Sequence, residues 1–310
     1  MICKLISPEE LRTFLPFLFR GVNEQERAIH LRLQQIEPVL SQNAIEIFAA
    51  FSRDNQVLGF TVSQQINDDP PLATFRLFHV LDTLQSVDPA GYIVTGKELF
   101  NAAFSHLKKI NTFIRVELLG LPAELVKYIV SNDFQQIDRV LMNIGRSSID
   151  SLVESELPPG YSIVSFKNAM KTSIGSLMLD YSSESTDNII YPEFAGADGS
   201  EKFLERFDET RNRYIKVLIR DQEILGVCFL LRSSSSSGHI SDLGISPNYQ
   251  RKGLGRALLT QSLLHMVRNE PSITRVALRV TIENKAAINL YRSLGFDQVE
   301  RFPALIWKAG

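Results

Sequence analysis

The sequence QRKGLGR, residues 250–256, combines two glycines with three cations between two apolar patterns. Residues 239–245 alternate as a strand does, and over 253–268 apolar residues recur every three or four positions, as in a helix with one buried face. The first amides of a helix lack partners and carry partial positive charge, so they bind phosphate oxygens. Gly253 and Gly255 let the backbone approach such an anion closely. We therefore predict an anion-binding turn, with further charge at its rim from Arg251, Lys252 and Arg256.

Two common nucleotide-binding motifs are excluded at this turn. A P-loop requires Gly-Lys followed by Ser or Thr, whereas Gly255 is followed by Arg256 and Ala257. A dinucleotide-binding fingerprint requires Gly or Ala at position 258, where this chain has Leu258. The predicted anion is therefore held in a different context.

The elements around the turn predict a mixed sheet. The strand at 239–245, the helix and a further alternating strand at 275–280 form a right-handed crossover, which makes the two strands parallel. Three more strands are expected before the crossover, at 161–166, 214–220 and 224–232, the last two joined by a turn at Asp221. The serine run 233–237 is expected to be a hairpin loop.

A second motif, NKAAINLYRSLGF, follows the crossover at residues 284–296. Together the two motifs resemble the GNAT superfamily of N-acetyltransferases. In that family an acetyl-CoA loop of the form Gln/Arg-x-x-Gly-x-Gly/Ala joins a strand to a helix, and a later helix follows an Asn, carries a Tyr and ends in Leu-Gly-Phe. The resemblance extends from Tyr161 to the C-terminus. It implies an α/β fold with a mixed, mostly antiparallel sheet, a central parallel strand pair and flanking helices.

The resemblance also implies that acetyl-CoA is the cosubstrate and that no metal is required. The pantetheine arm of coenzyme A is expected to pair with the main chain of 243–245, and ordinary sheet pairing of these residues is the alternative. Asn284 either bonds the cofactor or caps the helix that follows it. The cofactor-binding residues so implied are Leu243, Gly244, Ile245, Gln250, Arg251, Lys252, Gly253, Leu254, Gly255, Arg256 and Asn284.

Two residues are candidates for proton transfer. By the resemblance, Tyr291 protonates the departing thiolate; because a phenol has a pKa of about 10 and a thiol one of about 8.5, this step depends on positioning. The alternative for Tyr291 is a core residue of an amphipathic helix. Asp242 is the only carboxylate on the strand 239–245, and it is either the general base or a structural group. Many relatives have Glu where Ser241 stands, so another base also remains open.

These assignments predict an N-acetyltransferase that transfers an acetyl group to a primary amine by direct attack, the acceptor being a small molecule, a peptide N-terminus or a lysine. Neither Cys3 nor Cys228 lies in an activating motif, so no covalent enzyme intermediate is expected. The acidic stretch 180–201 either attracts a cationic amine or is a solvated loop. A non-catalytic acyl-CoA sensor, in which Tyr291 only packs, is the alternative function.

The first half of the chain contains a weak repeat of the second. Residues 54–59 resemble 221–226, and residues 131–134 resemble 293–296, in the same order and at nearly the same spacing. Duplication explains both matches, and chance similarity of turns is the alternative. We therefore expect two tandem GNAT-like domains, similar in plan to the tandem arrangement of mycothiol synthase.

A polar segment that ends in Pro158, Pro159 and Gly160 marks the expected boundary, which gives domains at 1–150 and 160–310. Aligning Gly96 with Gly255 puts Val94 at the first glycine position and leaves no cations beside it. The first domain is therefore expected to be degenerate and without cofactor.

Composition limits the partners of this 310-residue chain. Its 33 Lys and Arg and 35 Asp and Glu give a formal net charge of -2, which provides no field for nucleic acid. Two cysteines form neither a disulfide framework nor a metal-ligand set. We find no signal peptide and no apolar run long enough to cross a bilayer, so a cytoplasmic protein without membrane contact is expected. The sequence leaves a homodimer open.

Overall fold

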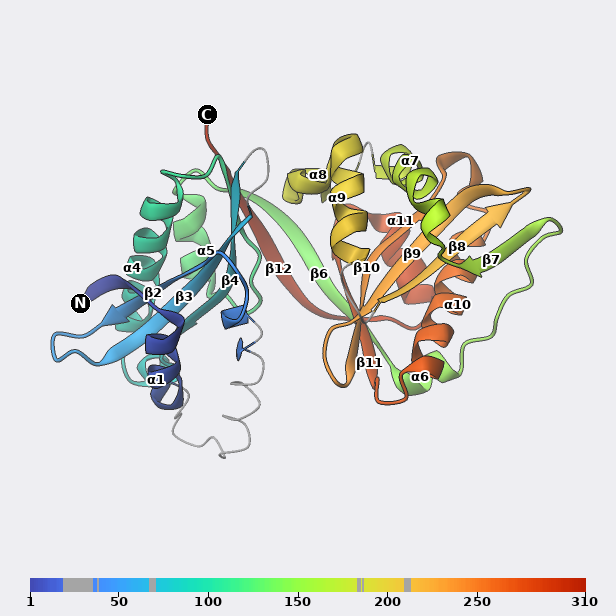
Figure 1. The fold of residues 1–310 in the computed structure, drawn as a ribbon. Coiled ribbons are helices and arrows are strands. Elements are labelled where there is room, and N and C mark those ends of the chain that lie inside the picture. Colours follow the sequence, from blue (N-terminus) through green and yellow to red (C-terminus); the bar gives the residue numbers. More distant parts are fainter. Residues whose placement is uncertain (19–35, 38, 67–70, 183–184, 186, 209–212) are drawn as a thin grey trace. The chain divides into compact units, whose positions relative to one another are not determined.

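The computed structural model describes residues 1–310 apart from 19–35, 38, 67–70, 183–184, 186 and 209–212 (Figure 1). The chain divides into two compact units, Met1–Ile137 with Phe302–Gly310, and Asp138–Arg301. Each unit therefore includes one strand from the other half of the sequence. The domains expected at 1–150 and 160–310 are continuous segments, whereas the compact units are formed with this exchange of strands.

The first unit is built on a mixed sheet. Its strands follow the order β1-β2-β3-β4-β5-β12, and the last of them comes from the C-terminus of the chain. Strands β4 and β5 are parallel. The β1–β2, β2–β3, β3–β4 and β5–β12 pairs are antiparallel. The strand bounds are Ile2–Ile6 (β1), Ile45–Phe51 (β2), Val57–Ile66 (β3), Leu72–Val80 (β4), Phe113–Val116 (β5) and Asp297–Lys308 (β12).

Helices cover both faces of this sheet. On β2, Phe48 joins a cluster with residues of α4 (Pro89–Leu107) and α5 (Ala123–Val130), whereas Ile47 and Ala49 join a cluster with α1 (Pro8–Leu18). Successive residues of a strand point to opposite faces, so α1 lies across the sheet from α4 and α5. A short helix, α3 (Asp82–Val87), precedes α4.

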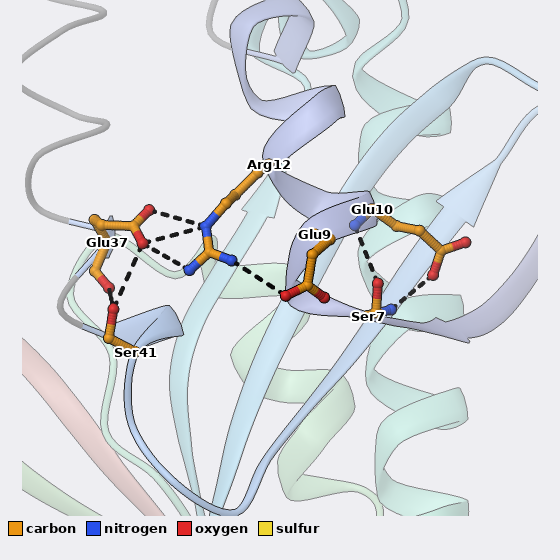
Figure 2. Close-up of polar contacts among 6 residues, drawn as sticks. All are labelled: Ser7, Glu9, Glu10, Arg12, Glu37 and Ser41. Atoms are coloured by element: carbon orange, nitrogen blue, oxygen red, sulfur yellow. Dashed lines mark hydrogen bonds and ion pairs between the residues drawn. The ribbon is translucent and has the colours of Figure 1, made fainter.

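Helix α1 begins with a reciprocal pair of hydrogen bonds, drawn in Figure 2. The Glu10 amide donates to Ser7 Oγ at 3.1 Å, and the Ser7 amide donates to Glu10 Oε2 at 2.7 Å. This capping box satisfies two amides at the start of the helix. On its outer side Arg12 bonds Glu37 at 2.6 Å, which ties α1 to the segment before Ser41.

The strands of the second unit are also mixed in direction. Its strands follow the order β6-β11-β10-β9-β8-β7, and β10 and β11 are parallel. The bounds are Gln135–Gly145 (β6), Tyr161–Ser165 (β7), Arg213–Arg220 (β8), Glu223–Arg232 (β9), Ser237–Ile245 (β10) and Arg275–Thr281 (β11). The five strands predicted for this half and the parallel crossover are confirmed. Asp221 and Gln222, both with positive φ, form the predicted turn between β8 and β9.

Helices again pack on both faces. Cys228 and Leu230 of β9 join a cluster with the crossover helix, and Val227 and Phe229 join a cluster with α7 and α9. The bounds are Arg146–Asp150 (α6), Lys171–Ser182 (α7), Asp187–Ile190 (α8), Gly196–Asp208 (α9), Leu254–Asn269 (α10, the crossover helix) and Lys285–Ser293 (α11), with single 3-10 turns at Asn168–Met170, Pro192–Phe194 and Pro247–Tyr249. Among the described residues of both units, no helix has the length and apolarity that a membrane span requires.

The sequence repeat has a structural counterpart. Gly59 of β3 pairs with Val80 at the end of β4, and Gly226 of β9 pairs with Ile245 at the end of β10. Asp133 and Gly295 both have positive φ, at 65° and 91°, and each lies between a helix and the last strand of its half. Both matched segments therefore occupy equivalent places in the two units.

The alignment of Gly96 with Gly255 is wrong. Gly96 is buried within α4, which already begins at Pro89, so neither Gly96 nor Val94 lies at a strand-to-helix turn. The helix starts earlier because Asp88 caps it, accepting a bond from the Gly91 amide at 2.9 Å, and Pro89 occupies the first turn. A carboxylate thus stands at the end of this helix where an anion would bind. The absence of a cofactor from the first unit stays a prediction.

Candidate active site

Strands β10 and β11 separate at one end. Their parallel register covers only 237–239 with 275–277, and beyond it β10 pairs with β9 alone while β11 pairs with β6. The register of β10 shifts between Ile240 and Asp242, so Ser241 is an extra residue in a bulge. Among the described strands, none pairs with the β11-facing edge of 243–245. That edge fits an extended, hydrogen-bonding ligand, as expected for the pantetheine arm.

The turn after β10 has the backbone of an anion site. Gly253 adopts φ +77°, and α10 begins at Leu254 with no side chain capping its first amides. A Cβ at Gly253 would find no atom within 4 Å, so the space beside these amides is open. Arg251 also has positive φ, at 58°. An uncapped helix start facing open space fits a diphosphate group.

The polar side chains of the turn contact the surrounding fold. Gln250 Nε2 donates to the Ile245 carbonyl at 3.0 Å and so fixes the end of β10. Lys252 Nζ donates to the Asn248 carbonyl at 3.0 Å and lies 5.0 Å from the Tyr249 ring centre. Arg256 Nη1 bonds Ser293 Oγ at 2.7 Å, which joins the start of α10 to the end of α11. These side chains shape the turn, and any role in binding a ligand stays a prediction.

One pocket of about 820 Å³ in the second unit brings most of the predicted residues together. Lys252 and Leu254 do not line it: Lys252 has the contacts given above, and the Leu254 side chain is buried in the core. The predicted residues that line the pocket are Asp242, Leu243, Gly244, Ile245, Gln250, Arg251, Gly253, Gly255, Arg256, Asn284 and Tyr291. The strand edge, the helix start and both candidate catalytic side chains therefore face one space.

Tyr291 lies on α11 with its side chain buried at the pocket wall, 8% exposed. Its ring centre is 5.6 Å from that of Phe296. The Phe296 amide bonds the Tyr291 carbonyl and the Gly295 amide bonds that of Arg292, so Gly295 ends the helix in a Schellman motif, as expected for a left-handed glycine. Burial raises the pKa of Tyr291 above its usual value, with smaller contributions from Cys228 and Asp242. The phenol therefore keeps its proton at neutral pH.

Asn284 is the N-cap of α11, because its Oδ1 accepts a bond from the Ala287 amide at 3.0 Å. The capping alternative is thus present in the structure. Since Asn284 also lines the pocket, its contact with a cofactor stays a prediction.

Asp242 has an aromatic partner that sequence reasoning missed. The Tyr181 hydroxyl, near the end of α7, donates to Asp242 Oδ2, and the Leu243 amide donates to Oδ1 at 2.8 Å. Both side chains line the pocket. Burial raises the pKa of the Asp242 carboxyl to about 6, although the bonds from Tyr181 and Leu243 act in the opposite direction. Tyr181 gave no signal in the sequence because it falls at helical spacing after Leu177 and Met178, like any core residue.

The pocket also contains a buried cation that sequence reasoning missed. Arg139 of β6 is 3% exposed, donates to the Tyr191 hydroxyl at 2.6 Å and lies 3.5 Å from Asp187 Oδ1. Thr281 donates to the same Asp187 oxygen at 2.9 Å. Of the described acidic residues in 180–201, only Asp187 lines the pocket, and Glu184 lies outside the described residues. Because Arg139 compensates Asp187, this stretch presents little net negative charge to the pocket.

Among the described residues, no three or more His, Cys, Asp or Glu side chains are grouped so that they could hold a metal ion. The pocket does contain one histidine, His239 on β10, close in sequence to Asp242.

Solved structures share this fold over the whole chain. A tandem GNAT protein from the clavulanic acid biosynthesis pathway superposes with a TM-score of 0.67 at 14% identity, covering 100% of this chain and 99% of that one. A GCN5-related N-acetyltransferase from Sphaerobacter thermophilus gives 0.63 at 13% identity, covering 99% and 95%. The fold is thus that of the tandem GNAT proteins, which confirms the predicted fold class of two GNAT-like repeats.

Sequence comparison places the second half in the same class. The family model described as the acetyltransferase (GNAT) family matches residues 183–296. The [ribosomal protein bS18]-alanine N-acetyltransferase of Escherichia coli (strain K12) is 30% identical over 152 residues, which are 49% of this chain and 82% of that protein. The chain belongs to the acetyltransferase (GNAT) family.

Other relatives match over shorter stretches. The mycothiol acetyltransferase of Thermobifida fusca (strain YX) is 40% identical over 60 residues, 19% of this chain and 18% of that enzyme. An N-alpha-acetyltransferase of Sulfurisphaera tokodaii is 38% identical over 63 residues, which cover 37% of its length. The chain thus aligns with well under two thirds of either relative.

Proposed function

We propose that the second unit is an N-acetyltransferase that uses acetyl-CoA to acetylate a primary amine. One observation carries the proposal: the unpaired edge of β10 and the uncapped start of α10 open into the same pocket as Tyr291 and Asp242. Family membership supports the acyl donor, and the E. coli relative is named for N-acetylation of an alanine. The acceptor class proposed here is a small-molecule amine, a peptide N-terminus or a lysine.

In this proposal the parts of coenzyme A bind at separate places in the pocket. We assign the diphosphate to the amides at 253–255 and the pantetheine arm to the main chain of 243–245, whose edge towards β11 has no partner among the described strands. Gln250 keeps this edge in place through its bond to the Ile245 carbonyl. When bound, acetyl-CoA supplies the acetyl group as a reactive thioester.

Asp242 and Tyr291 then transfer the protons of the reaction, Asp242 as the base and Tyr291 as the acid. Asp242 accepts a proton from the amine nitrogen as the nitrogen–carbon bond forms. Tyr291 donates its proton to sulfur as the carbon–sulfur bond breaks, so the products are the amide and the free thiol. A phenol is protonated at neutral pH, and burial raises the pKa of Tyr291 further, so the donor starts each turnover with its proton. Exchange with solvent restores both side chains for the next turnover.

Replacement of Tyr291 by Phe separates this proposal from a non-catalytic acyl-CoA sensor. We expect Tyr291→Phe to lower kcat by roughly 10²- to 10⁴-fold, the usual contribution of a positioned acid, with acetyl-CoA affinity nearly unchanged. Thiol release over a panel of amines gives kcat, and titration calorimetry gives affinity. Tyr161→Phe is the matched control, since Tyr161 lies on β7 and does not line the pocket. A wild-type protein that binds acetyl-CoA but releases no thiol with any amine establishes the sensor instead.

A further inference from the structure

Tyr181 and Asp242 come from elements far apart in the sequence and meet in the pocket. Asp242 is on β10 beside the bulge, and Tyr181 is in the last turn of α7. The Tyr181 hydroxyl bonds Oδ2 and the Leu243 amide bonds Oδ1, so each oxygen of the carboxylate has one donor. Two donors from different elements fix the plane of the carboxylate and leave one lone pair on each oxygen for another partner.

The position of the Tyr181 ring depends on a glycine. A Cβ at Gly244 would overlap Cε1, Cζ and Cδ1 of Tyr181, so the ring lies directly against the backbone of β10. Packing of α7 on the sheet holds the ring there, since Ile174, Leu177 and Met178 share a cluster with Val227 and Phe229 of β9. The absence of a side chain at Gly244 therefore makes room for the Tyr181 ring, independently of any cofactor contact.

Other ionisable groups interact with the carboxylate electrostatically or lie near it along the chain. Cys228 of β9, Tyr291 of α11 and Asp187 of α8 interact with it electrostatically, and His239 precedes it on β10. Arg139 of β6 and Arg279 of β11 line the same pocket. Burial raises the pKa of Asp242 and Asp187 adds to the rise, whereas the Tyr181 hydroxyl lowers it. Removing that hydroxyl thus favours the protonated form.

We propose that Tyr181 is a positioning residue for the reaction, holding Asp242 ionised and oriented as the proton acceptor, and that Gly244 is required to seat its ring. This inference rests on the proposed function, because Asp242 has to be the base. Tyr181 itself touches neither the amine proton nor the thioester in this role; it acts through the carboxylate.

The pH dependence of kcat/KM tests this role. Asp242 works as a base only when ionised, so wild-type kcat/KM rises with pH through about 6. Tyr181→Phe removes a hydrogen-bond donor to the ionised carboxylate, which raises the pKa of Asp242. The acid limb, meaning the rise of kcat/KM at low pH, therefore moves upward by about one pH unit. At pH values below this limb, kcat/KM of the variant is about tenfold lower than that of the wild type, and at high pH most of this difference disappears. Asp242→Asn is expected to abolish the limb.

Gly244→Ala reaches the same contact from the opposite side. The added methyl group displaces the ring, so the limb should move in the same direction as in Tyr181→Phe. Gly175→Ala is the matched control: it lies on α7 with Tyr181, and its Cβ would meet only Leu204 Cδ1 at an ordinary 3.8 Å. Its limb should coincide with that of the wild type. Thermal unfolding followed by circular dichroism confirms that each variant is folded.

A Tyr181→Phe variant with lower kcat but an unmoved limb overturns the positioning role, and so does an Asp242→Asn variant that keeps the limb. A carboxyl titration of Asp242 followed by carbon-13 NMR reads the same pKa without turnover. If the wild type is inactive but the pKa of Asp242 still differs between the wild type and Tyr181→Phe, the proposed function is overturned. The catalytic role of this contact is then overturned with it. Activity with an unmoved Asp242 pKa overturns only the inference.

Discussion

Gly253 shows how one backbone conformation fixes the binding turn. Its φ of +77° lies in the left-handed region, yet a Cβ there would meet nothing, so a side chain is opposed by strain and not by a clash. Gly253→Val is expected to cost about 1–3 kcal/mol of local strain and to weaken acetyl-CoA binding by roughly 5- to 100-fold as the turn relaxes. Titration calorimetry measures the change.

Gly160 provides the control for this prediction. It has φ +85° and the same open surroundings, but it lies before β7 and does not line the pocket. Gly160→Val should therefore strain the backbone comparably while leaving acetyl-CoA affinity within about twofold of the wild type. Equal losses of affinity in both variants would contradict the role assigned to the turn.

At this scale the sequence predicts the turn better than the contacts within it. Gly253 and Gly255 are visible because their spacing is local, and the structure brings them into the pocket with Tyr291. The partners of Lys252 and Arg256, which are Asn248 and Ser293, depend on how the chain folds. Tyr181 is hidden for the same reason, since its function depends on a carboxylate 61 positions away.

Helix α1 illustrates the contribution of a single element end. The reciprocal bonds of Ser7 and Glu10 provide acceptors for two amides at the start of the helix (Figure 2). Such amides have no preceding helical turn whose carbonyls could accept from them. Ser7→Ala is expected to destabilise the first unit by about 1 kcal/mol. Urea unfolding measures this loss, and acetyl-CoA binding should not change.

Glu9→Gln is the comparison for the capping box. Glu9 lies in the same turn but makes only a 3.7 Å ion pair with Arg12, and its side chain is 80% exposed. An exposed pair of this kind contributes little, so the loss should stay below about 0.5 kcal/mol. Equal destabilisation by the two changes would show that charge near the helix start matters as much as the cap, which contradicts this prediction.

Element boundaries followed from the sequence wherever the signals were local. The β8–β9 hairpin and α10 lie within two residues of their predicted bounds because alternation, turn residues and helical spacing agree there. The alignment of Gly96 with Gly255 is wrong, although Asp88 and Pro89, at the start of α4, are themselves a helix-start signal that places Gly96 inside the helix.

The exchange of strands makes each unit depend on both halves of the chain. Val140, Met142 and Ile144 of β6 are at most 2% exposed in the core of the second unit. Burying three such side chains contributes about 5–9 kcal/mol, comparable with the whole stability of a domain. A fragment 160–310 should therefore fail to fold, whereas 138–301, which keeps the residues of β6 that pair with β11 (139–145), should show a cooperative thermal transition.

Co-expression provides the check. If β6 is what the shorter fragment lacks, supplying 1–150 as a separate chain should restore soluble material that binds acetyl-CoA. A stable and cooperative fragment 160–310 would show that β6 contributes little. Sequence periodicity does not reveal this exchange. Strands β6 and β12 each come last in their half of the sequence, and the pattern of each is equally compatible with pairing in its own half.

The position of β12 also sets an order of events during synthesis. Residues 302–308 complete the first unit beside β5, yet they leave the ribosome only after the whole of the second unit, Asp138–Arg301. Until then β5 has a bare edge on which strands of other nascent chains can pair. The first unit thus precedes the second along the chain but is completed after it, and the yield of native molecules in a cell depends on how well the edge of β5 is protected until β12 has been made.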